Sequence, residues 1–206
     1  MKKLIAMMML SALVLTSTAI AQEKKAAATL MPGTYAVFET SMGNFTCQLF
    51  SREAPEAVSN FIGLAEGTKD YVNPKTHAKG KGPYYNGTIF HRVIDGFMIQ
   101  GGDPTGTGMG EPGYTFRNET NPNLKHDREG RLAMANRGRD TNGSQFYVTL
   151  GPKPSLDGGY TIFGQVVDGM DVVKKIGKVP VKLQGGEMSR PVTDVILKKV
   201  TIQRVK

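Results

Sequence analysis

The chain has 206 residues, a formal net charge of +8 and 39% hydrophobic residues, which fits a single domain with a buried core. Its 26 Lys and Arg residues are spread along the sequence, so the positive charge predicts a solvated surface rather than a nucleic-acid partner. Cys47 is the only cysteine, which excludes an internal disulfide, and its apolar strand pattern is typical of a buried residue. His77, His91 and His126 lack the spacing of metal ligands, so we expect no metal.

The first residues have the pattern of a cleavable export signal. Two lysines follow the initial Met, residues 4–15 form an apolar run, and residues 19–21 supply a small-x-small pattern. The apolar run is shorter than the roughly 20 residues that a membrane-spanning helix needs. We therefore expect residues 1–21 to be removed before Gln22, leaving a mature protein without a membrane segment. Its location would be the periplasm, or the extracellular space if the source has a single membrane.

Residues 22–33 are rich in Ala and Lys and predict an N-terminal tether, so the folded domain is expected to span residues 34–206. Two apolar-rich segments, 35–40 and 45–50, flank the turn residues 41–44. This arrangement predicts a β-hairpin at the start of the domain.

Two helices are predicted. The first begins near Pro55, carries apolar residues at i, i+3, i+4 and i+7 from Val58, and ends at Gly67. The second spans residues 168–176, where the apolar residues share one face and a glycine follows. Residues 70–84 contain several Pro and Gly residues and predict a long polar loop.

Short strand patterns with Gly-rich connections make up the rest of the sequence. Many short strands and few helices predict a mainly β fold, in which an antiparallel sheet closes on itself and leaves no exposed edge. The predicted strands span residues 88–93, 98–100, 131–135, 145–149, 161–166 and 195–204.

Two segments combine the residue types of a ligand pocket. Arg92 lies in an apolar strand pattern, where a charge either faces solvent or points into a pocket. Phe97 and Met98 follow it and, taken alone, would belong to a core. With Gln100 nearby, and with Gln145 and Phe146 in the second segment, the set provides an apolar surface with one cation and several amides.

The same two segments resemble the signature segments of the cyclophilins. They read FHRVIDGFMIQGGD over residues 90–103 and MANRGRDTNGSQFY over residues 134–147. The resemblance continues through LDGG at 156–159 and FGQVVDG at 163–169, and it extends from about Thr34 to the end. It implies an exported bacterial peptidyl-prolyl cis–trans isomerase, with a closed eight-stranded antiparallel β-barrel capped by two α-helices.

The resemblance also implies the roles of individual residues. Arg92 corresponds to the central catalytic residue, His91 belongs to the same site, and Tyr147 lies near the pocket in place of a frequent Phe. Three further groups correspond to the proline pocket, to the residues that hold the substrate backbone, and to the rim: Phe97, Met98, Phe146 and Leu156; Gln100, Ala135, Asn136 and Gln145; and Tyr160.

The chemistry of the reaction fits an arginine. Rotation about a peptide bond faces a barrier of roughly 18–20 kcal/mol. The nitrogen lone pair is delocalised in the planar amide and becomes free in the twisted transition state. A guanidinium aimed at the proline nitrogen therefore binds the transition state more tightly than the ground state. The mechanism needs no nucleophile and no cofactor.

The expected substrates are unfolded or extended polypeptides that contain proline, and the expected role is to assist the folding of exported proteins as a monomer. One alternative is a proline-peptide binding module or chaperone without catalytic activity. A second is a hydrolase that uses Ser144 with His91 and Asp103, although no G-x-S-x-G motif surrounds this serine. The G-x-G-x-x-G pattern at 108–113 contains a proline and precedes no helix pattern, so it predicts a surface loop.

Besides Tyr147, three positions depart from the common cyclophilin pattern. Ser155 stands where many members carry an aromatic residue that contacts cyclosporin. Tyr160 occupies a position often held by His. Arg137 replaces a small residue, and its charge would favour acidic neighbours in the substrate.

Overall fold

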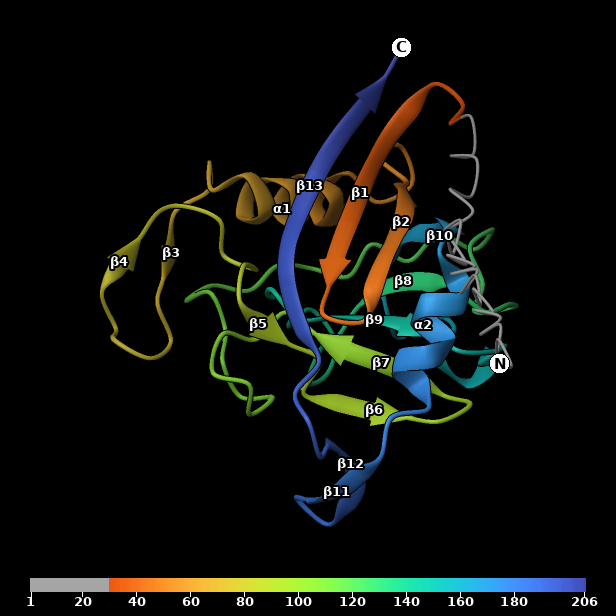
Figure 1. Cartoon of the computed structure of the whole chain (residues 1–206). Helices are drawn as coiled ribbons and strands as arrows, with labels where there is room; N and C mark the ends of the chain where they lie inside the picture. The colour runs from red at the N-terminus through yellow and green to blue at the C-terminus, as the bar shows by residue number, and fades with distance from the viewer. Residues whose placement is uncertain (1–29) are drawn as a thin grey trace, which may run out of the picture.

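One antiparallel sheet of nine strands organises the fold in the computed structural model, which describes residues 30–206 (Figure 1). The expected signal peptide and most of the expected tether lie outside these residues. The strand order is β5-β13-β1-β2-β10-β8-β9-β7-β6. The bounds of these strands are β1 Gly33–Thr40, β2 Gly43–Leu49, β5 Thr88–Ile89, β6 Arg92–Ile94, β7 Met98–Gly101, β8 Arg131–Met134, β9 Phe146–Thr149, β10 Ile162–Asp168 and β13 Ile196–Val205.

The predicted hairpin at the start of the domain is confirmed as β1 and β2. Phe38 pairs with Phe45 in the register of the two strands, and the two rings stack with their centroids 4.5 Å apart. Cys47 lies on the same face and is fully buried, which raises the pKa of its thiol. Gly43 closes the turn with a φ of +126°. A side chain there would also meet Val172 of the second helix. Both the backbone conformation and the limited space therefore favour glycine at this position.

The sheet curls strongly instead of forming the closed eight-stranded barrel that was expected. Its two end strands, β5 and β6, come from the segment predicted as one strand over residues 88–93. The chain leaves β5 through the buried residues Phe90 and His91 and enters β6 at the opposite end of the sheet. An isolated bridge joins Ile89 of β5 to Asp103, which follows β7, the neighbour of the end strand β6. The sheet is therefore nearly closed, by chain continuity and one bridge rather than by a full ladder.

The first predicted helix is confirmed as α1, Pro55–Glu66, which packs against β13. Proline begins it, Phe61 on its apolar face is fully buried, and Gly67 ends it with a φ of +73°. The amides of Glu56 and Ala57 donate to the carboxylate of Glu119 at 2.9 and 2.8 Å. A distant acid thus binds N–H groups that have no partner within the helix.

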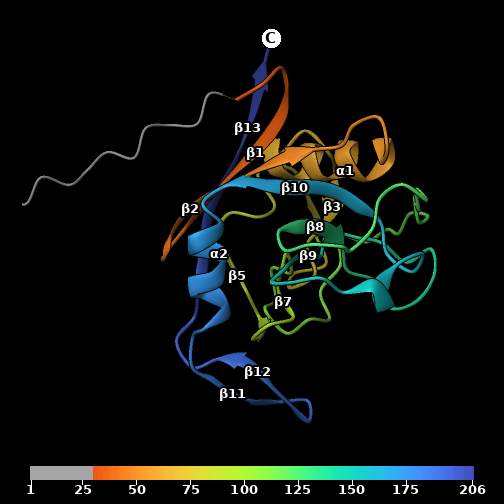
Figure 2. The same ribbon diagram turned by 90° about the vertical axis from the view of Figure 1, so that its right-hand side faces the viewer.

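The second helix, α2, spans Met170–Gly177, two residues later at its start than predicted, and includes the glycine expected to follow it. Its buried residues Val173 and Ile176 face the sheet, and the helix contacts β2, β6 and β7. Figures 1 and 2 show α1 and α2 well apart on the curled sheet. No helix within residues 30–206 is long and apolar enough to cross a membrane.

Two small hairpins lie outside the main sheet. The predicted loop 70–84 contains a short pair, β3 Tyr71–Val72 and β4 Lys79–Gly80. The second pair, β11 Val181–Gln184 and β12 Glu187–Pro191, was not predicted. Figure 1 shows β11 and β12 together at the lower end of the molecule, beneath β6.

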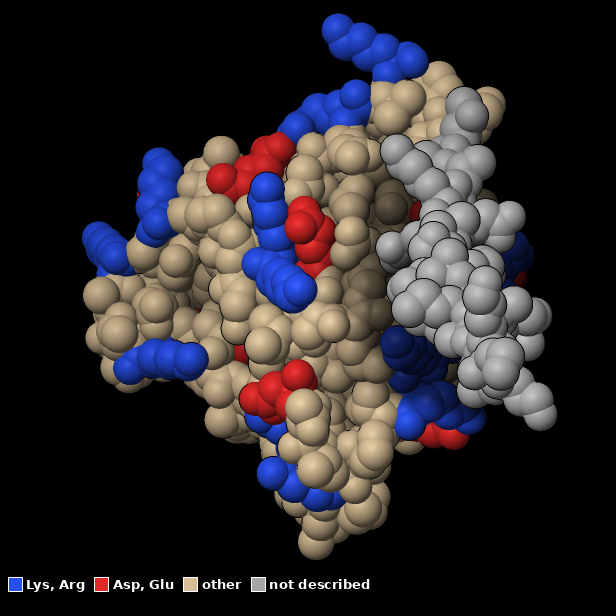
Figure 3. Space-filling view, viewed as in Figure 1, with Lys and Arg blue, Asp and Glu red and all other residues tan. Residues whose placement is uncertain are grey.

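On the visible face of the molecule, the charged side chains are scattered, as they are along the sequence. On the face in Figure 3, Lys and Arg side chains are separated by uncharged surface and by Asp and Glu. On this face they form no continuous basic patch.

Aromatic rings form the centre of the core. The Phe61 ring lies 5.0 Å from Tyr85, 5.4 Å from Phe163, 5.7 Å from Phe38 and 5.8 Å from Phe146, measured between centroids. The helix therefore inserts its central ring among residues of four separate segments.

Removing this ring is expected to destabilise the fold strongly. Phe61→Ala should lower the free energy of unfolding by about 3–5 kcal/mol, because it removes a buried ring and leaves a cavity that the strands cannot fill. Denaturant unfolding followed by circular dichroism measures the change. Met109→Ala serves as the control, since Met109 is 72% exposed and should shift stability by less than about 0.5 kcal/mol. Equal effects of the two substitutions would contradict this account of the core.

Candidate active site

A small pocket of about 90 Å³ lies where β6, β7 and β9 meet the connections that follow β8 and precede β10. Strand alternation explains its composition. Along β7, Met98 and Gln100 face the pocket, while Ile99 between them is fully buried in the core. Every residue that lines the pocket was among the predicted site residues: Arg92, Phe97, Met98, Gln100, Ala135, Asn136, Tyr147, Leu156 and Tyr160.

Phe146 does not line the pocket, and its expected place there is wrong. The ring is fully buried in the main core cluster, in contact with Phe38, Phe61, Tyr85 and Phe90. Neighbouring residues of a strand point to opposite faces, so Phe146 and Tyr147 cannot both face the pocket. The tyrosine faces the pocket and the phenylalanine faces the core.

Arg92 is held on the pocket wall by the register of two strands. Arg92 and Gln100 are paired residues of β6 and β7, and their side chains share one face. The Nη1 of Arg92 donates to Gln100 Oε1 at 3.2 Å, and its guanidinium lies 5.8 Å from the centre of the Phe97 ring. The pocket therefore combines an apolar floor with one ordered cation.

A second contact to Arg92 was not predicted from the sequence. Glu187 of β12 accepts hydrogen bonds from Nε at 2.7 Å and from Nη2 at 3.0 Å. The two residues are 95 positions apart, and no local pattern marks Glu187 as part of a site.

Gln145 lies beside the pocket and not in it. Its Oε1 accepts a hydrogen bond from Gln100 Nε2 at 3.1 Å, and its own Nε2 donates to the carbonyls of Gly108 and Gly110 at 3.0 Å each. The amide therefore holds the 108–110 loop next to the site. It lines a side pocket of about 50 Å³ together with Gln100, Gly108, Glu111, Ala135, Asn136 and Arg137.

The charge of Arg137 is paired within the protein. Its Nη1 lies 2.8 Å from Glu111 Oε1, and its Nη2 donates to the carbonyl of Gly108 at 2.7 Å. The preference for acidic neighbours in the substrate stays a prediction, and this contact weighs against it, because a substrate carboxylate would have to compete with Glu111.

His91 is buried behind the site and lines a wider groove next to Arg92. Neither ring nitrogen has a hydrogen-bond partner among the described residues. Burial lowers the pKa of the imidazole to about 4, with the positive charges of Arg190 and Arg92 acting in the same direction and Asp103 opposing them. The side chain is therefore neutral at pH 7.

The arrangement of Ser144 does not fit a hydrolase. Its hydroxyl is buried, donates to the carbonyl of Gly102 at 2.8 Å and lies 3.3 Å from the hydroxyl of Tyr84. His91 makes no hydrogen bond to it. The serine therefore has no base in contact, which is the first requirement for a nucleophile of this type.

A buried polar chain supports the far wall of the pocket. His126 Nδ1 lies 2.9 Å from Asp157 Oδ1, and its Nε2 lies 2.9 Å from the Tyr147 hydroxyl. Burial lowers the pKa of His126, although Asp157 raises it. The tyrosine, unlike the phenylalanine frequent at this position, is thus oriented by a hydrogen bond as well as by packing. Sequence reasoning missed this chain, because the three residues come from three separate segments.

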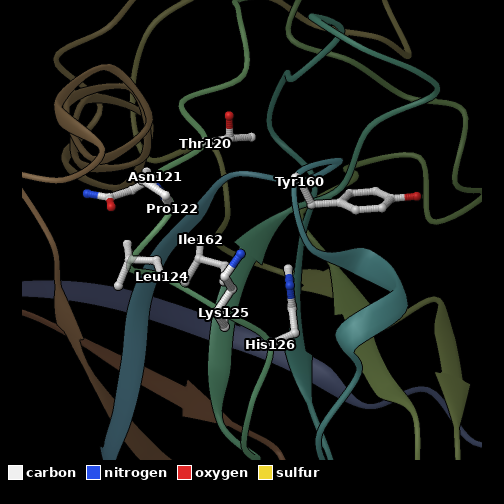
Figure 4. A pocket seen from close by; sticks show the side chains of 9 residues that line it. Thr120, Asn121, Pro122, Leu124, Lys125, His126, Tyr160 and Ile162 are labelled. Atoms are coloured by element: carbon white, nitrogen blue, oxygen red, sulfur yellow. The ribbon is translucent and has the colours of Figure 1, made fainter.

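A larger cavity of about 370 Å³ adjoins the pocket, and Tyr160 lines both. Figure 4 shows Tyr160 and His126 on one side of this cavity and Asn121, Pro122 and Leu124 on the other. Arg92 does not line this cavity. The cavity therefore extends the surface next to the pocket, and Tyr160 is the one residue that the two linings share.

The chain is similar to known proteins in both sequence and fold. The family model described as cyclophilin type peptidyl-prolyl cis-trans isomerase/CLD matches residues 35–205. The chain belongs to this cyclophilin family. The peptidyl-prolyl cis-trans isomerase A of Mycobacterium tuberculosis is 48% identical over 169 residues, which cover 81% of this chain and 91% of that protein. Peptidyl-prolyl cis-trans isomerase B of Streptomyces anulatus is 44% identical over 171 residues, or 82% and 96% of the two chains.

A solved cyclophilin gives the same result for the fold. The crystal structure of a cyclophilin type peptidyl-prolyl cis-trans isomerase of Cryptosporidium parvum matches with a TM-score of 0.72 and 35% identity, covering 84% of this chain and 99% of that chain. The mainly antiparallel β fold with two helices is therefore confirmed, with nine strands in a nearly closed sheet. Its activity is that of the family, peptidyl-prolyl cis–trans isomerisation.

The buried histidine makes the stability of this cyclophilin depend on pH. The pKa of His91 is about 4 in the folded protein and about 6.5 in an unfolded chain, so the unfolded state binds more protons between these values. The contribution of His91 to the free energy of unfolding is therefore fully present above pH 6.5 and is lost as the pH falls towards 4. Between pH 7.5 and 5.0, wild type should lose about 1–2 kcal/mol more than His91→Gln in denaturant unfolding. Parallel losses in the two proteins would show that His91 is not buried in its neutral form.

Proposed function

We propose that Arg92 is the catalytic residue of this cyclophilin and that the pocket beside it holds the proline ring of an X–Pro bond. The observation that supports this most directly is the position of the guanidinium on the wall of an apolar pocket that is otherwise without charge. Phe97, Met98, Tyr147 and Leu156 supply the apolar surface. A structure of the Cryptosporidium parvum protein obtained in the presence of the dipeptide Ala-Pro, with a TM-score of 0.71 to this chain, supports a proline ligand.

The remaining predicted residues suit the binding of an extended peptide backbone. Gln100, Ala135 and Asn136 line both the proline pocket and the side pocket. Backbone and amide groups there can pair with the peptide groups that flank the proline. His91, neutral and buried behind Arg92, supports the wall and takes no part in proton transfer, since the reaction transfers no proton.

The energetics require more than one contribution. A charge-assisted hydrogen bond is worth roughly 1.5–3 kcal/mol, whereas a rate gain of about 10⁵ needs about 7 kcal/mol. The apolar pocket supplies part of the difference, because the twisted amide is less dipolar than the planar amide. Holding the flanking backbone supplies the rest, because it fixes the ends between which the bond rotates.

The cellular role that fits the sequence is assistance to the folding of exported proteins. Residues 1–21 have the pattern of a signal peptide, and slow X–Pro isomerisation limits the folding of many proteins. The substrates are unfolded or extended polypeptides that contain proline, and the protein acts on them as a monomer outside the cytoplasm.

The alternative is a proline-peptide binding module or chaperone without catalytic activity. The two functions need the same pocket and differ in what Arg92 does. An arginine held toward an apolar pocket costs desolvation that simple binding of a proline ring does not require, which favours catalysis.

Replacing Arg92 tests the catalytic role. Arg92→Ala should lower the acceleration of cis–trans exchange in an X–Pro peptide by about 10- to 150-fold, the effect of one charge-assisted hydrogen bond. Arg92→Lys should recover only part of it, because an ammonium lacks the planar fork. NMR exchange spectroscopy measures the rates without a coupled protease.

Arg204→Ala is the matched control, since Arg204 pairs with Glu66 on the exposed side of α1 and should leave the rate unchanged. A folded Arg92→Ala variant with full activity would contradict the catalytic role. Binding of the peptide by wild type without acceleration would favour the non-catalytic alternative.

Export predicts a defined mature N-terminus. When the full chain is expressed in a bacterium with two membranes, the periplasmic fraction should contain protein that begins at Gln22, as determined by mass spectrometry. Ala21→Phe should block processing, because the signal peptidase accepts a small residue at that position. A chain that retains residues 1–21 and stays in the cytoplasmic fraction would contradict export.

A further inference from the structure

The β11–β12 hairpin forms one wall of the groove that passes Arg92. It is a separate two-stranded sheet, and β12 contacts β6, the strand that carries Arg92 (Figures 1 and 2). The groove between the hairpin and the main sheet has a volume of about 540 Å³. Its lining comes from the site on one side, with Arg92 and Gln100, and from the hairpin on the other, with Gln184, Glu187 and Ser189.

The base of the hairpin is attached to the body of the protein. Arg190 donates from Nη1 to the carbonyl of Gly106 and lies 2.8 Å from Asp194 through Nη2. Within the hairpin itself, the amide of Val192 donates to the carbonyl of Pro180 at 2.9 Å and closes its base. These contacts fix the position of β12 and therefore the position of the residue at its start, Glu187.

Glu187 binds one edge of the Arg92 guanidinium with both carboxylate oxygens. The distances are 2.7 Å from Oε2 to Nε and 3.0 Å from Oε1 to Nη2. Two parallel hydrogen bonds to a planar group fix its plane as well as its position. The strong hydrogen bond from Arg92 also keeps the pKa of Glu187 below its ordinary value, with a further hydrogen bond from Ser189 in the same direction. The carboxylate is thus charged at neutral pH.

The remaining hydrogen-bond donors of Arg92 match the needs of a substrate. A guanidinium has five N–H donors. Glu187 accepts from Nε and Nη2, and Gln100 accepts from Nη1. The second N–H of Nη1 faces the Met98 sulfur, a weak acceptor, at 3.9 Å, and the second N–H of Nη2 has no acceptor among the described residues. These two donors sit on a group whose orientation is fixed from two sides before a peptide arrives.

We propose that Glu187 is a positioning residue for isomerisation, which holds the guanidinium of Arg92 in the orientation that addresses the proline nitrogen in the transition state. This inference rests on the proposed catalytic role of Arg92. Both side chains are partly open to solvent, at 33% for Arg92 and 43% for Glu187. The ion pair therefore adds little to the stability of the fold. Its effect is to restrict the long side chain of Arg92 to one conformation before the substrate binds.

On electrostatic grounds alone, Glu187 would lower the rate of isomerisation instead of raising it. A carboxylate next to Arg92 partly neutralises its charge and competes with the substrate for its donors. The geometry favours positioning, because Glu187 occupies only the edge formed by Nε and Nη2. The second N–H of Nη2 stays free, and that of Nη1 faces only the weak acceptor Met98 Sδ. The two effects predict changes of opposite sign when Glu187 is replaced.

Five variants of the full mature chain test the proposal with a neutral X–Pro peptide. NMR exchange spectroscopy at several peptide concentrations gives kcat and KM for each. Glu187→Ala should lower kcat roughly 2- to 12-fold with little change in KM, which corresponds to the loss of order in one long side chain. Glu187→Gln should recover part of the loss, because the amide oxygen still accepts one hydrogen bond. Lys182→Ala, on the same hairpin but not in the groove lining, should match wild type.

The double variant Arg92→Ala/Glu187→Ala, compared with Arg92→Ala, separates this proposal from the proposed function. In Arg92→Ala, the further change Glu187→Ala should have no effect on the residual rate, because a positioning residue acts only through Arg92. If Arg92→Ala is inactive but Glu187→Ala keeps or exceeds the wild-type kcat, positioning is wrong and the catalytic role of Arg92 stands. If Arg92→Ala itself keeps full activity, both are wrong. Equal losses in the Lys182 and Glu187 variants would show a structural effect of the hairpin and would also overturn the proposal.

Discussion

The packing of Phe146 determines where the active site can form. Its ring lies within 6.3 Å of four other rings, those of Phe38, Phe61, Tyr85 and Phe90, measured between centroids. Because strand residues alternate, burying this ring turns both of its neighbours, Gln145 and Tyr147, toward the opposite face. The register of β7 then places Gln100 beside Tyr147, and the register of β6 places Arg92 beside Gln100. The packing of this one ring in the core thus determines which side chains form the row from which the pocket is built.

Sequence reasoning succeeded where a local pattern carries the information. The i, i+3, i+4, i+7 spacing from Val58 and the closing Gly67 located α1, and the turn residues 41–44 located the first hairpin. It failed where two neighbouring residues have the same chemistry and opposite faces. Phe146 and Tyr147 are both aromatic, and the resemblance to the cyclophilins assigned both of them to the pocket, whereas the alternation of the strand allows only one of them there.

Contacts between distant segments could not be predicted in this way. The segment 88–93 reads as one strand, because its apolar pattern does not reveal that the chain crosses from one end of the sheet to the other at Phe90 and His91. The chain from Asp157 through His126 to Tyr147 joins separate segments, and Glu187 reaches Arg92 across 95 positions. Each of these residues, taken alone, is most simply a surface or core residue. Their meeting depends on the closure of the sheet, which no short window of sequence contains.

The electrostatics of the site fit a reaction that moves no proton and transfers no group. Each arginine at the site has a carboxylate partner, Arg92 with Glu187 and Arg137 with Glu111, and burial keeps His91 neutral. The pocket therefore presents oriented N–H groups with little net charge. Oriented N–H groups stabilise most strongly the electron density that appears only at the transition state. In the twisted X–Pro amide, this is the lone pair that becomes localised on the proline nitrogen. Such a site suits the X–Pro bond, which is uncharged, in keeping with the isomerase activity of the family.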